Sequence, residues 1–176
     1  MLLSLNRKLL DPVSKRIFFV PDPVPLTVED APKREATIPF HPQKDMGSRT
    51  VHTAGEFFVA EGDLKSMKKG SVFRLMDLYN VRVASTGRRV SAKYAGDEVT
   101  GSLRKFQWVT PAHVEIRVTV PDVLFLEGDE YNRDSLKEVS GFAEESVSSL
   151  KVGDIVQFPR FGFARLDSPG QFILSG

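Results

Sequence analysis

The chain has 176 residues, of which 41% are hydrophobic and 27% charged, enough to bury a core as one or two compact domains. It has no apolar run near the roughly 20 residues of a membrane helix and no signal-peptide pattern at its N-terminus, which indicates a cytoplasmic protein. The absence of cysteine excludes disulfides, thiolate nucleophiles and thiolate metal sites.

The charge of the chain is segregated, although the formal net charge is only +1. Residues 65–105 hold ten Lys or Arg against three Asp or Glu, a local charge of +7, and the rest holds 14 against 20, a charge of −6. A basic segment in an otherwise acidic protein suits a docked polyanion such as nucleic acid. The alternative is a solvated surface whose imbalance is accidental.

Two short helices are predicted, and strands account for most of the rest. Residues 5–15 favour a helix that Pro12 interrupts, and residues 63–69 favour one helical turn capped by Asp63 and ended by Gly70. Short β-branched and aromatic runs between turn residues predict the strands. They lie at 17–20, 24–28, 36–39, 49–52, 56–59, 71–74, 79–83, 90–94, 105–108, 114–120, 123–126, 155–158, 161–166 and 171–174.

An acidic stretch at 127–149 interrupts the strands, and its polar composition predicts a long loop. Many short strands with Gly and Pro turns and little helix indicate an all-β protein made of small closed barrels or sandwiches. No internal sequence repeat is present.

Motifs for catalysis are absent from the sequence. It has no phosphate-binding Gly-Lys-Ser/Thr loop, no dinucleotide-binding glycine pattern and no nucleophile elbow. The histidines, His41, His52 and His113, are too widely spaced to suggest a zinc site. Nothing in the residues argues for a catalytic or metal site.

Three stretches, in order, resemble the C-terminal region of the archaeal and eukaryotic branch of glutamyl- and glutaminyl-tRNA synthetases. The first is Asn-Arg-Lys-Leu-Leu-Asp-Pro at 6–12, which runs into residues 16–24. The second comprises His-Pro at 41–42, Met-Gly-Ser-Arg at 46–49 and residues 70–77. The third is Leu-Lys-Val-Gly-Asp-Ile-Val-Gln-Phe at 150–158, followed by residues 161–167.

The resemblance implies two small barrels of the ribosomal protein L25 type that bind the anticodon of tRNA. We expect residues 1–15 to form a helical connector, 27–112 the first barrel, and 16–26 with 113–176 a discontinuous second barrel. It also implies a catalytic domain of the same polypeptide, outside this chain, that uses ATP and Mg²⁺ to attach the amino acid. This chain alone is then expected to hold no cofactor and to be inactive.

Glutamate is the favoured amino acid, because residues 6–19 look closer to archaeal glutamyl enzymes, and tRNA(Glu) is the expected partner. A glutaminyl enzyme remains an alternative. A freestanding barrel that binds an acidic protein, and more remotely a small unassigned enzyme, are the other readings.

Arg16 and Gln157 match the family positions that contact the uracil in the middle of the anticodon. Uracil presents carbonyl acceptors and an N3–H donor, which a guanidinium and an amide can satisfy once the base is splayed out. The alternative is that Arg16 pairs with an acidic neighbour and Gln157 faces solvent.

Arg74 matches a family position at the first anticodon base, but Met76 stands where glutaminyl members have an arginine. The family position for the third base aligns near Ser66, so that assignment does not transfer. The lysines nearby are expected to approach the RNA instead. They are Lys65, Lys68 and Lys69.

Several aromatic residues are candidates for stacking on bases, although alternation along strands sends about half of them into the core. The sequence singles out none of them. They are Phe18, Phe19, Phe57, Phe58, Trp108, Phe158, Phe161 and Phe163.

Overall fold

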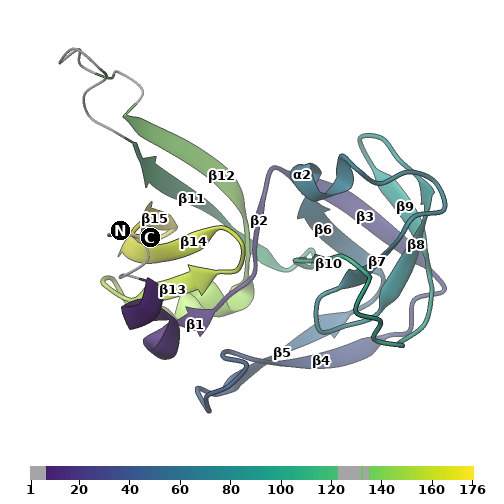
Figure 1. The fold of residues 1–176 in the computed structure, drawn as a ribbon, viewed down its shortest axis with the longest axis horizontal. Helices are drawn as coiled ribbons and strands as arrows, with labels where there is room; N and C mark the ends of the chain where they lie inside the picture. The colour runs from purple at the N-terminus through teal and green to yellow at the C-terminus, as the bar shows by residue number, and fades with distance from the viewer. Residues whose placement is uncertain (1–6, 123–131, 133–134) are drawn as a thin grey trace.

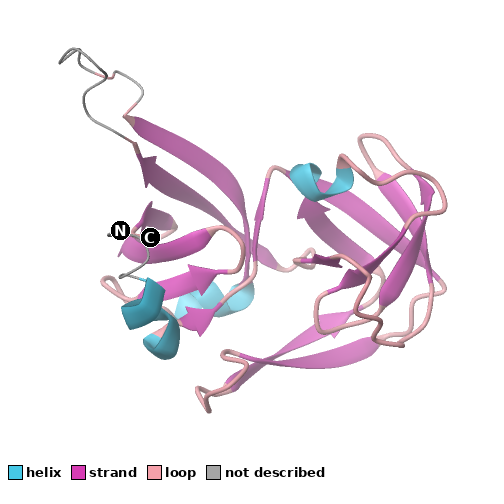
Figure 2. Cartoon of the chain, viewed as in Figure 1, coloured by secondary structure: helices cyan, strands magenta, loops and turns pink. Residues whose placement is uncertain are grey.

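The computed structural model describes residues 7–122, 132 and 135–176. Within these residues most regular structure is β-strand, arranged in two curled, barrel-like sheets and a separate hairpin (Figures 1 and 2). The predicted all-β class is confirmed. The helical segments described are residues 7–10, η1 (Asp11–Val13), α2 (Glu61–Leu64) and η2 (Glu145–Ser149).

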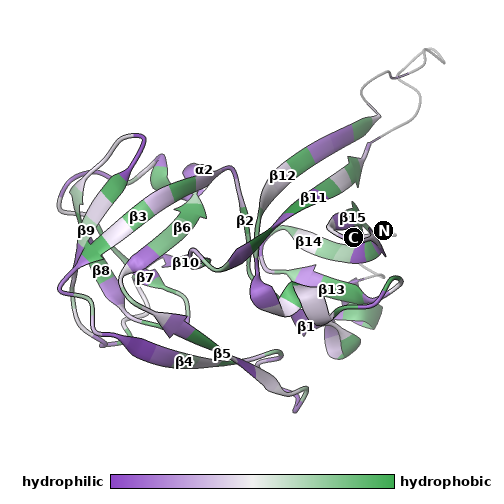
Figure 3. Ribbon diagram, turned by 180° about the vertical axis from the view of Figure 1, so that it is seen from behind, coloured by the Kyte–Doolittle hydropathy of each residue, from purple (hydrophilic) through white to green (hydrophobic). Residues whose placement is uncertain are grey.

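The first sheet has six strands, in the order β10 (Lys105–Phe106), β7 (Val72–Leu75), β8 (Asn80–Ser85), β9 (Val90–Tyr94), β3 (Pro23–Glu29) and β6 (Glu56–Ala60). In β3, Leu26 and Val28 are buried while Thr27 and Glu29 are exposed, the alternation of a strand with one face on the core. Hydrophobic and hydrophilic residues follow each other along the strands (Figure 3). The core of this sheet includes the fully buried Trp108.

The second sheet has seven strands, in the order β1 (Lys15–Arg16), β13 (Ile155–Phe158), β14 (Gly162–Ser168), β15 (Gln171–Leu174), β11 (His113–Pro121), β12 (Leu136–Glu144) and β2 (Phe19–Pro21). It combines β1 and β2, near the N-terminus, with strands from the last third of the chain. Its core includes Phe158 and Phe172, whose ring centroids lie 5.3 Å apart.

The chain passes between the two sheets at Phe18 and Phe19. Phe18 packs edge-on against Trp108 of the first core, with ring centroids 5.7 Å apart. Phe19 packs on Phe158 of the second core at 5.0 Å. Successive side chains of an extended chain point in opposite directions, so one dipeptide contributes to both cores.

The change from one sheet to the other is completed at Asp22, which stands between β2 and β3 with a φ of 45°. Aspartate tolerates this left-handed conformation better than most residues. Residues 23–26, expected with 113–176, lie instead in β3, which pairs with β6 and β9 of the first sheet. That the two sheets are independent domains stays a prediction.

A hairpin made of β4 (Arg34–Pro39) and β5 (Ser48–Thr53) contacts the cores of both sheets. Ala36 and Ile38 of β4 anchor the hairpin in the first core. Its tip places Phe40 against the second core. In Figure 1 the hairpin runs from the six-stranded sheet toward β1.

Two local predictions are wrong. Part of the acidic stretch at 127–149 forms β12 and η2, because β12 pairs along nine residues with β11 and its charged positions Lys137 and Glu138 lie at an end of the strand that is exposed on both faces. The helical turn expected at 63–69 is α2, which begins at Glu61 after Ala60. The strand predicted at 123–126 lies outside the described residues.

The stability of the second sheet depends on Gly141, where β12 meets β2. A Cβ there would lie 2.4 Å from the carbonyl oxygen of Val20 and 2.9 Å from the Cα of Pro21. These backbone atoms cannot move without disturbing the β12–β2 pairing.

We therefore expect Gly141→Ala to lower the free energy of unfolding by at least about 2 kcal/mol, since overpacking against backbone is poorly relieved. Urea unfolding of the two proteins measures this. Gly101→Ala is the matched control, because a Cβ at Gly101 would meet nothing within 4 Å. Equal stability of the Gly141 and Gly101 variants would contradict the close approach.

Candidate functional site

The parallel pairing of β1 with β13 places Arg16 directly beside Gln157, its register partner. Neighbouring strands lie about 4.8 Å apart, so one small planar group can reach both side chains. Both residues line a cavity of about 840 Å³. The structure thus brings together two residues that stand about 140 positions apart in the sequence.

Both side chains carry a polar atom for which the described residues provide no hydrogen-bond partner. The Nε of Arg16 and the Oε1 of Gln157 are buried and have no hydrogen-bond partner within the described part of the chain. An unsatisfied buried polar group costs about 1–3 kcal/mol, so such atoms call for an explanation. The two cavity residues thus carry one unpaired donor and one unpaired acceptor, which suit a ligand edge that offers both functions.

Backbone and side-chain contacts hold Arg16 in place. Its N–H donates to the Phe40 carbonyl at 2.7 Å, and the N–H of Ile17 donates to the Gln157 carbonyl at 3.0 Å. Its Nη2 forms an ion pair with Asp11 Oδ1 at 3.1 Å. The acidic neighbour considered from the sequence is therefore present, but it engages only one end of the guanidinium, whose side chain is 35% exposed.

Arg74, expected at the first anticodon base, is buried within the first sheet and committed to internal contacts. Its Nη1 donates to Asn80 Oδ1 at 3.0 Å and to the Asp97 carbonyl at 3.2 Å, and its Nη2 donates to the Leu78 carbonyl at 3.2 Å. These bonds tie the 77–80 turn to the 95–98 loop. Because the side chain is buried and three of the five guanidinium N–H groups are already engaged, the geometry does not favour direct contact of Arg74 with RNA, and this role stays a prediction.

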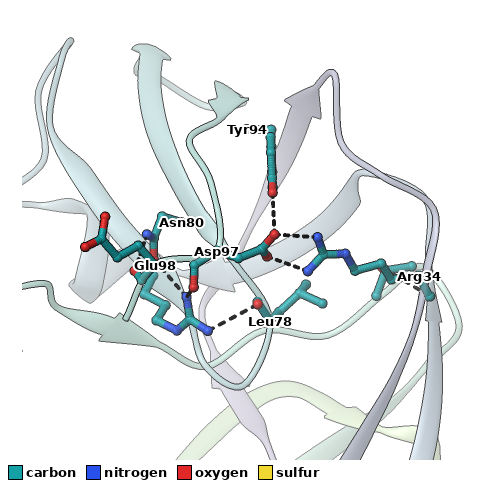
Figure 4. A network of polar contacts seen from close by, with 8 residues as sticks. Arg34, Leu78, Asn80, Tyr94, Asp97 and Glu98 are labelled. Atoms are coloured by element: carbon teal, nitrogen blue, oxygen red, sulfur yellow. Dashed lines mark hydrogen bonds and ion pairs between the residues drawn. The ribbon is translucent and has the colours of Figure 1, made fainter. Parts of the chain in front are cut away.

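Asp97 is the exposed centre of the same network (Figure 4). Arg34 donates to both of its carboxylate oxygens, at 2.5 and 2.7 Å, and the Tyr94 hydroxyl donates to one of them at 2.6 Å. These hydrogen bonds, that of Arg34 first, lower the pKa of Asp97 from 3.8 to about 2. The network thereby joins the β4–β5 hairpin to the end of β9.

The three predicted lysine contacts lie exposed on the segment after α2. Arg104 reaches this segment and donates to Ser66 Oγ. Of the ten Lys and Arg residues in 65–105, only Arg74 is buried, so nine positive charges are available to solvent. The lysines are Lys65, Lys68 and Lys69.

Eight further residues line the Arg16 cavity, and sequence reasoning assigned none of them to it. They include three cationic residues and an aromatic one: Arg7, Lys8, Arg160 and Phe161. Arg160 has a φ of 62°, and its Nη2 pairs with Asp63 Oδ2 at 2.8 Å, which connects the β13–β14 turn to α2. The helical segment that carries Arg7 and Lys8 precedes β1. Arg7 and Lys8 lie in the first of the three family-like stretches and Phe161 is among the aromatic candidates, whereas nothing in the sequence pointed to Arg160. Their approach to Arg16 depends on long-range packing.

The described residues do not suggest a metal centre. Within residues 7–122, 132 and 135–176, no group of three or more His, Asp or Glu side chains could hold a metal ion.

Comparisons with known proteins give the cavity its context. Residues 14–96 and, separately, residues 105–167 match family models described as "tRNA synthetases class I (E and Q), anti-codon binding domain". Together these matches cover the six-stranded sheet and all of the seven-stranded sheet except β15 and the last residue of β14. The chain belongs to the anticodon-binding domains of class I glutamyl- and glutaminyl-tRNA synthetases.

Curated relatives agree with this family along nearly the whole chain. A glutamate–tRNA ligase from Nitrosopumilus maritimus is 33% identical over 98% of the chain, and one from Pyrococcus abyssi is 40% identical over 94%. A third, from Hyperthermus butylicus, is 38% identical over 95%. The chain spans only 28–30% of the length of these ligases.

The membership confirms the resemblance drawn from the three sequence stretches. Arg16 lies inside the first matched segment and Gln157 inside the second. The candidate cavity is therefore assembled from both anticodon-binding modules of the family.

The Arg34–Asp97 contact yields a pH-dependent stability. The pKa of Asp97 in the folded chain, about 2, lies below its ordinary value of 3.8. The contact therefore contributes fully to the stability of the fold above about pH 4, and this contribution is lost as the pH falls through 2. We expect Asp97→Asn to be slightly less stable than the parent at pH 6 and equally stable near pH 2. Urea unfolding at several pH values measures the difference. A difference that grows on acidification would contradict this account.

Proposed function

We propose that this chain is the anticodon-recognition part of a glutamate–tRNA ligase, and that Arg16 and Gln157 read the uracil at the middle of the anticodon. The observation that carries the proposal is their side-by-side placement in β1 and β13 at one cavity, with a donor and an acceptor left unused. This arrangement has no evident purpose in a barrel that binds only an acidic protein surface.

The chemistry of uracil fits these two side chains. A guanidinium supplies only donors, which suit the O2 and O4 carbonyls of the base. The amide of Gln157 supplies an acceptor for N3–H and a donor as well. Single-stranded loop bases are read in this way, through edges exposed when the base leaves its stack. The cavity of about 840 Å³ is within the range of small-ligand sites and large enough for one base.

The exposed basic residues of 65–105 would supply attraction for the RNA backbone. Phosphate contacts of this kind add affinity without distinguishing sequences. The ion pair between Asp63 and Arg160 places the start of this basic segment next to the wall of the Arg16 cavity. One strand of RNA can therefore contact the lysines and reach the cavity.

The identity of the tRNA rests on the relatives. Those compared above are named glutamate–tRNA ligases, which favours tRNA(Glu), although a glutaminyl enzyme would share the middle uracil.

The catalytic domain of the same polypeptide would bind ATP and Mg²⁺ and attach glutamate, so this chain alone should be inactive. We place the whole enzyme in the cytoplasm. In the part of the chain that is described, no helix is long and apolar enough to span a membrane.

Base reading by Arg16 predicts a selective defect. We expect Arg16→Ala to reduce the preference of the chain for an anticodon stem-loop with uracil over one with cytosine at the middle position by roughly tenfold, the scale of a base-edge contact. Gln157→Met, which keeps the side-chain length without the amide, should act in the same direction. Fluorescence anisotropy with the two RNAs measures both dissociation constants.

Two controls separate reading from attraction and folding. Lys68→Ala should weaken the binding of both RNAs by the same factor, because a phosphate contact does not depend on the base. Asp11→Ala removes the ion pair of Arg16 without removing the guanidinium, and should keep the preference. If a folded Arg16→Ala variant, judged by its melting temperature, prefers uracil as strongly as the parent, the assignment is wrong.

A further inference from the structure

Phe161 occupies a distinctive place in the turn between β13 and β14. Its N–H donates to the Phe158 carbonyl at 2.9 Å, closing the turn. Its ring meets Phe19 edge-on, with centroids 5.1 Å apart and an interplanar angle of 81°. Phe19 is in turn packed on Phe158, so the orientation of the Phe161 ring is set by the core behind it.

Unlike its aromatic neighbours, Phe161 is not fully covered. Phe158 and Phe163 are 0% and 2% exposed, whereas Phe161 is only partly buried against the second core. Phe161 lines the Arg16 cavity and also a neighbouring cavity of about 360 Å³. Phe161 therefore borders both cavities and shares the larger one with Arg16 and Gln157.

We propose that Phe161 is a stacking platform for the base whose edge Arg16 and Gln157 contact. The inference rests on the proposed function and adds the second element that a splayed-out base requires, a planar apolar surface for its face. The edge contacts select the base, whereas the stack supplies affinity for any planar base. Because the ring is held by Phe19 before RNA arrives, little conformational entropy is lost when the base binds.

The test uses the chain as it stands with an anticodon stem-loop that carries either uridine or 5,6-dihydrouridine at the middle position. Dihydrouridine keeps O2, O4 and N3–H but has a puckered, non-aromatic ring. We expect the parent chain to bind the dihydrouridine loop roughly tenfold more weakly, the scale of one base–aromatic stack. Phe161→Leu should bind the uridine loop roughly tenfold more weakly than the parent does, and its affinities for the two loops should be nearly equal. Phe161→Tyr should behave like the parent.

The preference for uracil over cytosine separates this inference from the function on which it rests. Phe161→Leu should keep that preference, because Arg16 and Gln157 are unchanged. Full affinity and full sensitivity to dihydrouridine in folded Phe161→Leu would overturn the stacking role and leave base reading in place. If the parent chain binds the uridine and dihydrouridine loops with equal affinity, the stacking proposal is wrong, whatever the variants show. A parent chain with no preference for uracil would overturn both proposals.

Discussion

The arrangement of the molecule depends on a buried ion pair between Arg49 of β5 and Glu144 of β12. Their side chains are 8% and 7% exposed, and Arg49 Nη2 lies 2.7 Å from Glu144 Oε2. The same carboxylate oxygen accepts the N–H of Phe18, and the guanidinium lies 5.0 and 5.1 Å from the ring centroids of Phe18 and Phe40. Removing one partner of such a pair leaves a buried charge uncompensated, at a cost of about 3–5 kcal/mol.

The Arg49–Glu144 ion pair matters because the candidate site is assembled from segments that are distant in sequence. The hairpin tip supplies the Phe40 carbonyl that holds Arg16, and His41 Nε2 lies 3.1 Å from the Asp11 carbonyl. The other wall comes from the β13–β14 turn, which Gln107 reaches through a hydrogen bond to the Pro159 carbonyl. With the hairpin fixed to β12, the N-terminal segment is held against β13, and the Arg16–Gln157 register follows.

Sequence reasoning reached the features that depend on local pattern or on the family motif. Alternation predicted the strands, and the motifs predicted that Arg16 and Gln157 would act together. It failed where a partner far along the chain decides the structure. The charges on β12 suggested a loop, because only the pairing with β11 makes this exposed segment a strand. Arg74 looked available for RNA, because the spacing of the sequence does not reveal the Asn80 and Asp97 groups that bind it. The sequence did not distinguish Phe161 from the other aromatic candidates, because its packing on Phe19 depends on the tertiary structure.

The most direct measurement is photo-crosslinking with 4-thiouridine at the middle position of an anticodon stem-loop. Sulfur replaces O4, an edge atom expected to face Arg16 and Gln157, so crosslinked peptides should map to the segment 155–163 or to residues 7–16. The same label at the first anticodon position should give a different map. Crosslinks from the middle position that fall only on the outer strands of the six-stranded sheet would contradict the central claim that this cavity receives the middle base.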